Sequence, residues 1–362
     1  MKLRAIRRDH LVMGIAAVLF ALCLIAINIL WPGAFGVFIA IGGVVGAFVV
    51  VYEVRLTKGL AQAEFIRDLQ TSFSSDANIG ELWRKILLDE EVTADDRALV
   101  SSYLTFFETL HLLLKRGALD PALTDDLFRN RFFKAVGNPG VLRVLVREPG
   151  SFTNIHDLIE RWHGYLLANQ TPMHPGYYAY IEAITEAKGY QVEMLSEDDL
   201  TDLEDLQDEV LQTLSDDSWL RANTDVMLKE CLLDHVTLGV RHHGKLVAAA
   251  VLYDGGKSDE SIKHYFTDDP KELTKSVNLK LVLALKEHRR HGLSRALVEL
   301  LEKQATDLGK TEIMCTIHPK NEPSESLFRR LGYERVDSVT TSYGKRSVFA
   351  RKLPLPNKQW AR

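Results

Sequence analysis

A group of basic residues around one glycine offers the clearest chemistry in this sequence. The segment EHRRHGLS, residues 287–294, stands between an apolar, strand-like run at 277–285 and a long helical pattern. The first backbone N–H groups of a helix have no partner inside it, and the helix dipole favours negative charge there. Gly292 places no Cβ in the way of an approaching oxygen. Cationic partners are supplied by Arg289, Arg290 and Arg295. The pattern predicts a site for a pyrophosphate.

Two segments of the C-terminal half resemble the signatures of one enzyme family. The run LVLALKEHRRHGLSRALVELLEKQATDLG resembles the acyl-CoA-binding segment of the GNAT acetyltransferases, in which Arg289, Gly292 and Ser294 take the three defining positions. Ser294 departs from the usual Gly or Ala but is small. The run NEPSESLFRRLGY, from Asn321 to Tyr333, resembles the second signature, a helix led by Asn and ending in Gly and an aromatic residue. The resemblance covers roughly residues 190 to 354.

This resemblance implies an N-acetyltransferase that moves an acetyl group from acetyl-CoA to a primary amine by direct attack. In the family the fourth and fifth strands part to admit the pantetheine arm, which bonds to free backbone groups as an added strand would. A backbone N–H of the same strand would polarise the thioester carbonyl. The residues expected to bind the cofactor are Leu283, Ala284, Leu285, Arg289, Arg290, His291, Gly292, Leu293, Ser294, Arg295, Asn321 and Phe328.

The groups that transfer protons stay open at this stage. The family often has a Tyr seven residues after the Asn to protonate the CoA thiolate, but this sequence has Phe328 there. Candidate acids by proximity are Tyr333, Tyr343 and His318. Glu287 is a candidate base, and Asp254, His235 and Glu312 are alternatives near strand ends. Each of these residues also has a plain structural reading, as a core or surface group.

The elements expected to position the loop are the strands and helices of residues 189–354. Strands are predicted at about 191–195, 235–241, 245–253, 277–285, 311–317, 333–341 and 346–353, with a glycine turn at residues 242–244. Amphipathic helices are predicted around 200–214 and 219–233, after Gly292, and from Asn321. The predicted class of the whole chain is α+β, with a mixed sheet flanked by helices.

The middle of the chain, residues 56–188, reads as an all-α cytosolic domain. Apolar residues recur there at helical spacing, and turn signals separate the repeats. His156, His163 and His174 have no metal-ligand spacing, so no metal is predicted. Residues 355–362 are read as a tail.

Two uncharged runs near the N-terminus predict a transmembrane hairpin in residues 1–55. They cover about 11–30 and 34–52, each long enough to cross a bilayer as a helix. Basic residues precede the first run and follow the second, so the positive-inside rule predicts a multi-pass protein of the inner cell membrane whose soluble domains face the cytoplasm. The lipid bilayer is then a partner.

Composition narrows the remaining partners. The net charge is -5 and the pI about 6.2, so nucleic acid is not an expected partner. Three widely spaced cysteines indicate neither a disulfide framework nor a metal knuckle.

Two other functions stay open beside the enzyme. One is a catalytically weak acyl-CoA-binding regulatory module, suggested by Phe328. The other is a membrane assembly or interaction protein that acts through the helical domain, with a homo-oligomer formed through the anchor or that domain.

Overall fold

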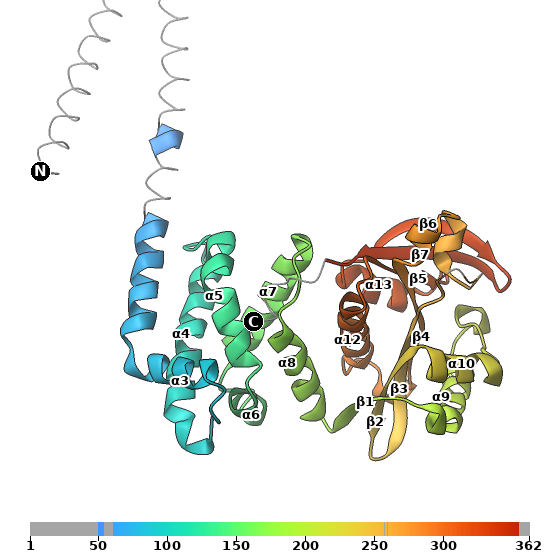
Figure 1. Cartoon of the computed structure of the whole chain (residues 1–362), viewed down its shortest axis with the longest axis horizontal. Coiled ribbons are helices and arrows are strands. Elements are labelled where there is room, and N and C mark those ends of the chain that lie inside the picture. Colours follow the sequence, from blue (N-terminus) through green and yellow to red (C-terminus); the bar gives the residue numbers. More distant parts are fainter. Residues whose placement is uncertain (1–49, 54–60, 257, 259, 355–362) are drawn as a thin grey trace, which may run out of the picture. The chain divides into compact units, whose positions relative to one another are not determined.

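The computed structural model describes residues 50–53, 61–256, 258 and 260–354. Compactness divides the chain into two units, Met1–Gln70 and Thr71–Arg362. The labelled helices and strands of Figure 1 all lie in the second unit.

The predicted membrane spans are corrected by this structure. Among the residues described, no helix combines the length and apolar character needed to cross a bilayer. The longest labelled helix, α4 (Arg97–Lys115), buries one apolar face in a protein core and carries polar residues on the other. The predicted spans themselves, about 11–30 and 34–52, lie outside the described residues except for 50–52. The predicted fold class with two transmembrane helices, and the multi-pass membrane location derived from it, are therefore wrong on this finding.

The described part of the predicted helical region contains helices throughout. Residues 61–75 are helical. The labelled helices that follow are α3 (Ala77–Leu87), α4, α5 (Pro121–Val136), α6 (Pro139–Arg147), α7 (Thr153–Ala168) and α8 (Pro175–Glu186). The start of α5 illustrates how the sequence sets their limits. The Asp120 side chain accepts hydrogen bonds from the N–H groups of Ala122 and Leu123, and Pro121 follows at a position where its missing N–H costs nothing.

Aromatic side chains fill the core of these helices. Phe107 lies 4.9 Å from Phe132 between ring centroids, and Phe132 stacks on Trp162 at 4.9 Å. The indole Nε1 of Trp162 donates a 2.8 Å hydrogen bond to the buried carboxylate of Asp125, which satisfies both groups.

The C-terminal part is built on a mixed sheet in the order β1-β2-β3-β4-β5-β7-β6. Its strands are β1 (Tyr190–Met194), β2 (Val236–His242), β3 (Lys245–Tyr253), β4 (Ser276–Ala284), β5 (Glu312–Ile317), β6 (Glu334–Thr341) and β7 (Gly344–Lys352). β4 and β5 run parallel, and the other neighbours run antiparallel. The predicted turn between β2 and β3 is tight, with positive φ at both His243 and Gly244. The fold class is a mixed α/β architecture.

Helices cover both faces of this sheet (Figure 1). One face carries α9 (Leu200–Gln212) and α10 (Asp225–Asp234), with the short turn η4 (Asp217–Trp219) between them. The other carries α12 (Leu293–Asp307) and α13 (Glu322–Arg330). The connection from β3 to β4 contains η5 (Ile262–Tyr265) and α11 (Pro270–Leu273).

The far side of α12 packs against α8 of the helical region. The Tyr177 hydroxyl donates a 3.0 Å hydrogen bond to the Glu299 carboxylate, which is buried. Helical region and sheet thus belong to one compact unit, and the predicted boundary between residues 188 and 189 stays a prediction.

Candidate active site

The sheet opens between β4 and β5. Their parallel register covers only Ser276–Asn278 of β4 and Glu312–Met314 of β5, although β4 continues to Ala284 and β5 to Ile317. The edges beyond the paired part are free to bond an extended ligand, as an unpaired strand edge would be.

A bulge in β4 accounts for this parting. The register of β4 with β3 shifts between Ala249 and Val251, and Leu281 there has a φ of 51°. A bulge bends its strand and increases the local twist. The left-handed conformation is costly for a leucine, by roughly 1 to 2 kcal/mol, so the surrounding packing must hold it in place. Leu281 is itself buried among core residues.

The basic loop joins the end of β4 to the start of α12. After η6 (Lys286–His288), Arg290 has a φ of 67° and Gly292 a φ of 87° as the N-cap of α12. A Cβ on Gly292 would meet nothing within 4 Å, so the space in front of it is open. Within the residues described, no acceptor is assigned to the N–H groups of Leu293, Ser294 and Arg295. Such a helix start attracts anions.

The side chains of the loop divide between the opening and the fold. Arg290 and His291 are exposed, Ser294 is half-buried and Leu293 packs in the core. Arg289 is exposed too, and its Nε donates to the Ala284 carbonyl oxygen at 3.1 Å. The loop therefore presents two exposed guanidinium groups beside the helix start.

Two of the backbone groups expected to bind the cofactor already have partners within the protein. The Ala284 carbonyl already accepts the bond from Arg289. The Leu285 N–H donates to the Val247 carbonyl of β3 at 2.9 Å, so this amide faces away from the opening. We therefore no longer assign the Leu285 N–H to the ligand, whereas Leu283 remains a predicted contact.

Histidines line the other side of the loop around Tyr190 of β1. The Tyr190 hydroxyl lies 3.1 Å from Nδ1 of His288, and its ring lies 5.8 Å from that of His291. Burial and the neighbouring His242 and His291 lower the pKa of His288. Because His288 is then neutral near pH 7, the positive charge of the loop comes from its arginines.

The Arg295 side chain does not face the loop, although the sequence predicts that it binds the cofactor. Its guanidinium contacts the Glu160 carboxylate at 2.9 Å, the Glu299 carboxylate at 2.9 Å and the Tyr177 hydroxyl at 3.1 Å. These three partners hold the side chain between α12 and the helical region. We therefore remove Arg295 from the candidate phosphate ligands.

Asn321 caps the helix of the second signature. Its side-chain oxygen accepts from the Ser324 N–H at 3.2 Å, and its own N–H donates to the His318 carbonyl. The cap uses only the oxygen. No acceptor is assigned to its Nδ2 amide in the described part of the chain, so this group can still reach a ligand.

The predicted acids differ sharply in access. Phe328 is buried and packs edge-on against Tyr333, with centroids 5.0 Å apart. Tyr333 is only 2% exposed, and burial, together with the Glu302 carboxylate, raises the pKa of its hydroxyl well above the ordinary value. A group so enclosed offers no surface to a substrate, so Tyr333 is a core residue. Glu287, the candidate base, lies exposed in η6.

His318 and Tyr343 lie where β5 ends. Nε2 of His318 is 3.4 Å from the Ser218 hydroxyl, which in turn donates to Asp216. The Tyr343 hydroxyl is 3.5 Å from that of Thr316 in β5. His318 therefore follows β5 directly, whereas Tyr343 lies in the turn between β6 and β7 and reaches the end of β5 through Thr316.

A charged group on the α9–α10 side of the sheet was not predicted. Glu260 pairs with Lys280 of β4 at 3.0 Å and with Arg221 at 3.1 Å. Burial alone would raise the pKa of Glu260, but the hydrogen bond from Lys280 and the nearby Arg221 hold it below the ordinary value. The guanidinium groups of Arg221 and Arg346 contact the Tyr343 ring at 5.1 and 4.7 Å from its centroid. A lysine within the apolar run of β4 was the one local signal for this group.

Sequence comparison identifies the C-terminal part of the chain. Residues 200–333 match the model of the Acetyltransferase (GNAT) family, from the start of α9 to the residue before β6. No curated protein matches the chain at a significant level. The family match confirms the predicted acetyltransferase and acetyl-CoA as its acyl donor.

Several solved structures resemble a little under half of the chain. An N-acetyltransferase from Staphylococcus aureus Mu50 is 14% identical, with a TM-score of 0.36 over 45% of this chain and 97% of that one. The ribosomal-protein-S18-alanine N-acetyltransferase from Escherichia coli is 14% identical, with a TM-score of 0.35 over 47% and 97%. A putative acetyltransferase from Salmonella typhimurium, solved with its cofactor acetyl-CoA, is 18% identical, with a TM-score of 0.36 over 46% and 94%.

Proposed function

Because residues 200–333 form an acetyltransferase domain of the GNAT family, we propose that this chain transfers the acetyl group of acetyl-CoA directly to a primary amine. The observation that carries the proposal is the opening between β4 and β5, which leads into the loop at Gly292. One continuous path then serves both ends of the donor: the free edge of β4 receives the pantetheine arm, and the start of α12 receives the diphosphate.

The chemistry needs little beyond this placement. The lone pair of a neutral amine attacks the thioester carbonyl carbon, the new C–N bond forms, and the C–S bond breaks. The amine gives up a proton and the CoA thiolate accepts one. Holding the two reactants together removes most of the entropic cost of their encounter, and a backbone N–H directed at the carbonyl oxygen stabilises its developing charge.

We assign the protonation of the thiolate to His318. It follows β5 directly, it is half-buried, and its ring nitrogen is within reach of the Ser218 hydroxyl. Tyr343 is the second choice because two guanidinium groups contact its ring and its hydroxyl is near Thr316. Histidine is the side chain that most often transfers protons in enzymes, which suits a group that donates and regains a proton in each turnover.

The proposed donor site is tested by Gly292→Glu. A carboxylate in front of the α12 start repels the diphosphate, so acetyl-CoA binding measured by calorimetry should fall at least a hundredfold. The matched control is Gly309→Glu, at the other end of the same helix. Gly309 also has a positive φ, 73°, with nothing within 4 Å of its Cβ position, so both variants introduce the same strain and charge.

Turnover is tested separately by the release of CoA thiol with a panel of primary amines. We expect release with at least one amine for the wild type and the Gly309→Glu variant, and none for Gly292→Glu. Equal acetyl-CoA affinity in the two variants would overturn the donor site. Tight acetyl-CoA binding without release on any amine would instead contradict the transfer reaction.

A further inference from the structure

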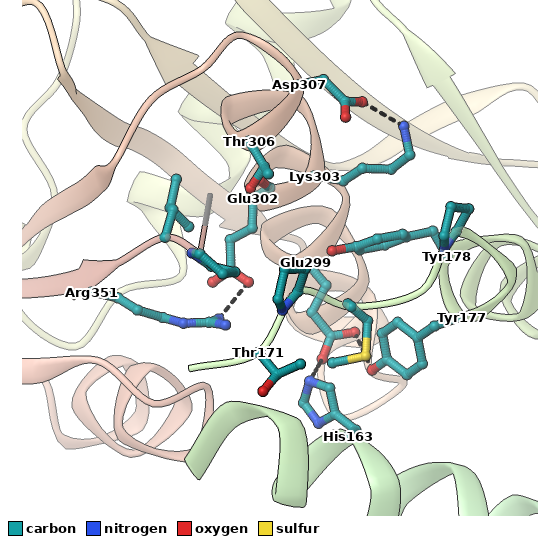
Figure 2. Close-up of a pocket in the computed structure, with 15 residues that line it drawn as sticks. His163, Thr171, Tyr177, Tyr178, Glu299, Glu302, Lys303, Thr306, Asp307 and Arg351 are labelled. Atoms are coloured by element: carbon teal, nitrogen blue, oxygen red, sulfur yellow. Dashed lines mark hydrogen bonds and ion pairs between the residues drawn. The ribbon is translucent and has the colours of Figure 1, made fainter. Parts of the chain in front are cut away.

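A cavity of about 260 Å³ lies away from the parted strands, where α8 meets α12 (Figure 2). Its walls come from α7, from the segment between α7 and α8, from α8 itself, from the outer face of α12 and from the end of β7. Glu299 and Glu302 of α12 line it, seven or more residues along the helix from Gly292. At 1.5 Å per residue this places the cavity about 10 Å or more from the basic loop.

The carboxylates in and beside the cavity outnumber the cations that pair with them. Figure 2 shows the Glu299 carboxylate beside His163 and Tyr177, and that of Glu302 beside Arg351. Lys303 and Asp307 form an ion pair with each other at 2.7 Å. Of the other carboxylates, Glu299 and Glu302 line the cavity. Glu160, which does not line it, shares Arg295 with Glu299, and Arg351 pairs with Glu302. His163 adds no charge, because burial lowers its pKa to about 3.

One of the buried carboxylates, Glu302, is also incompletely bonded. Glu302 is 6% exposed, and its Oε1 has no hydrogen bond of normal geometry in the described structure. Its neighbour, the Tyr333 hydroxyl, interacts with this carboxylate but likewise makes no well-formed bond. Burial raises the pKa of Glu299 to about 7, although Arg295 opposes the shift. A buried carboxylate without a full set of donors is costly, so a cation placed beside it in the cavity would stabilise its charge.

The rest of the lining is apolar or aromatic. Tyr177 and Tyr178 contribute rings, and the other lining side chains include Pro172, Met173, Pro175, Leu353 and Pro354. A group that binds here therefore meets carboxylate oxygens at one end and carbon at the other. A volume of about 260 Å³ limits a ligand to a small molecule.

We propose that this cavity is a binding site for a small primary ammonium ion with a short alkyl body, separate from the acetyl-transfer site. An ammonium group supplies three donors and the missing positive charge to Glu299 and Glu302. Its alkyl chain replaces water against the tyrosine rings and the proline and methionine side chains. Because the ligand touches both α8 and α12, it ties the helical region to the helix that begins at the donor loop.

Binding to the full chain is measured by ligand-observed NMR, with butylamine as the probe and butan-1-ol as its neutral counterpart. We expect butylamine to bind at least tenfold more tightly than butan-1-ol. Glu302→Gln, which keeps the shape and can still accept from Arg351, should weaken butylamine at least tenfold. Thr171 lines the cavity and is labelled in Figure 2, so Thr171→Phe should fill the cavity and also weaken butylamine binding at least tenfold. Glu186→Gln, on the exposed side of α8, should leave the affinity unchanged.

The Gly292→Glu variant separates this site from the transfer reaction. Butylamine should bind that variant as it binds the wild type, because the cavity does not depend on acetyl-CoA. Equal affinities for amine and alcohol, or an unchanged affinity in both Glu302→Gln and Thr171→Phe, would overturn the proposal. Loss of butylamine binding in Gly292→Glu alone would also overturn it, since the amine would then occupy the transfer site.

Discussion

Arg290 combines an unfavourable backbone with a useful charge. It is exposed and has a φ of 67°, a conformation that asparagine adopts more readily than arginine. Arg290→Asn should therefore leave the free energy of unfolding unchanged or raise it by a few tenths of a kcal/mol. Acetyl-CoA affinity should fall about tenfold, as expected for the loss of one charged hydrogen bond of roughly 1.5 kcal/mol. Arg147→Asn, at an exposed site on α6, is the control for charge. Unchanged affinity in Arg290→Asn would exclude this side chain from the donor site.

Substitution of His318 should lower the reaction rate and leave the binding of acetyl-CoA unchanged. His318→Gln keeps a polar side chain but removes the proton donor, so kcat should fall about a hundredfold, as for a lost general acid. The KM for acetyl-CoA should stay within twofold. Tyr343→Phe should retain most of the activity. The opposite pattern, with Tyr343→Phe inactive and His318→Gln active, would transfer the role to Tyr343.

At the scale of the element, Glu299 makes α12 sensitive to pH. Its pKa is raised from 4.5 to about 7, mainly by burial. Between these values the folded chain binds more protons than the unfolded chain, so the contribution of Glu299 to stability falls as pH rises from 4.5 to 7. His163 of α7, with its pKa lowered to about 3, acts in the opposite direction between pH 3 and 6.5. The Glu299 carboxylate also faces Tyr177 of α8 and Arg295 of α12, which keep their charge states over this range.

Glu299→Gln isolates this effect. Near pH 5 the free energy of unfolding of the variant should be no higher than that of the wild type. Between pH 5 and pH 8 the difference between the two proteins should change in favour of the variant by up to about 3 kcal/mol, since one unit of pKa shift corresponds to about 1.4 kcal/mol. Urea unfolding of both proteins at each pH measures the change. Glu186→Gln, on the exposed side of α8, should show no such trend. A stability difference that does not vary with pH would mean that Glu299 is ionised throughout.

The elements also show which parts of the site the sequence could predict. Strands such as β3 and β4 are long apolar runs bounded by turn residues, and the basic loop is a local pattern, so both were predictable within a few residues. The φ of Leu281 was not, because a leucine in a strand gives no local sign of a bulge. Arg295 and Glu299 resemble an ordinary surface ion pair of a helix. Only the packing of α8 on α12 buries Glu299 and turns Arg295 away from the loop.

At the scale of the whole molecule, the helical region and the sheet should respond to the donor together. The Tyr177 hydroxyl of α8 and the Glu160 carboxylate of α7 both contact α12 side chains, and α12 begins at the donor loop. A ligand that binds only the folded chain at 100 times its Kd stabilises it by about 2.7 kcal/mol, and a cooperative unit shares that gain. Acetyl-CoA should therefore slow amide hydrogen exchange about a hundredfold in the slowest amides of both α12 and α8.

The controls separate this coupling from direct contact with the donor. Gly292→Glu should abolish the protection in both helices, because it removes the binding itself. Tyr177→Phe and Glu160→Gln together remove two links between the helical region and α12, so protection should persist in α12 and fall in α8. If acetyl-CoA protects α12 in the wild type but leaves α8 unchanged, the helical region unfolds on its own. The buried contacts around Glu299 would then hold the two parts together without transmitting the binding of the donor.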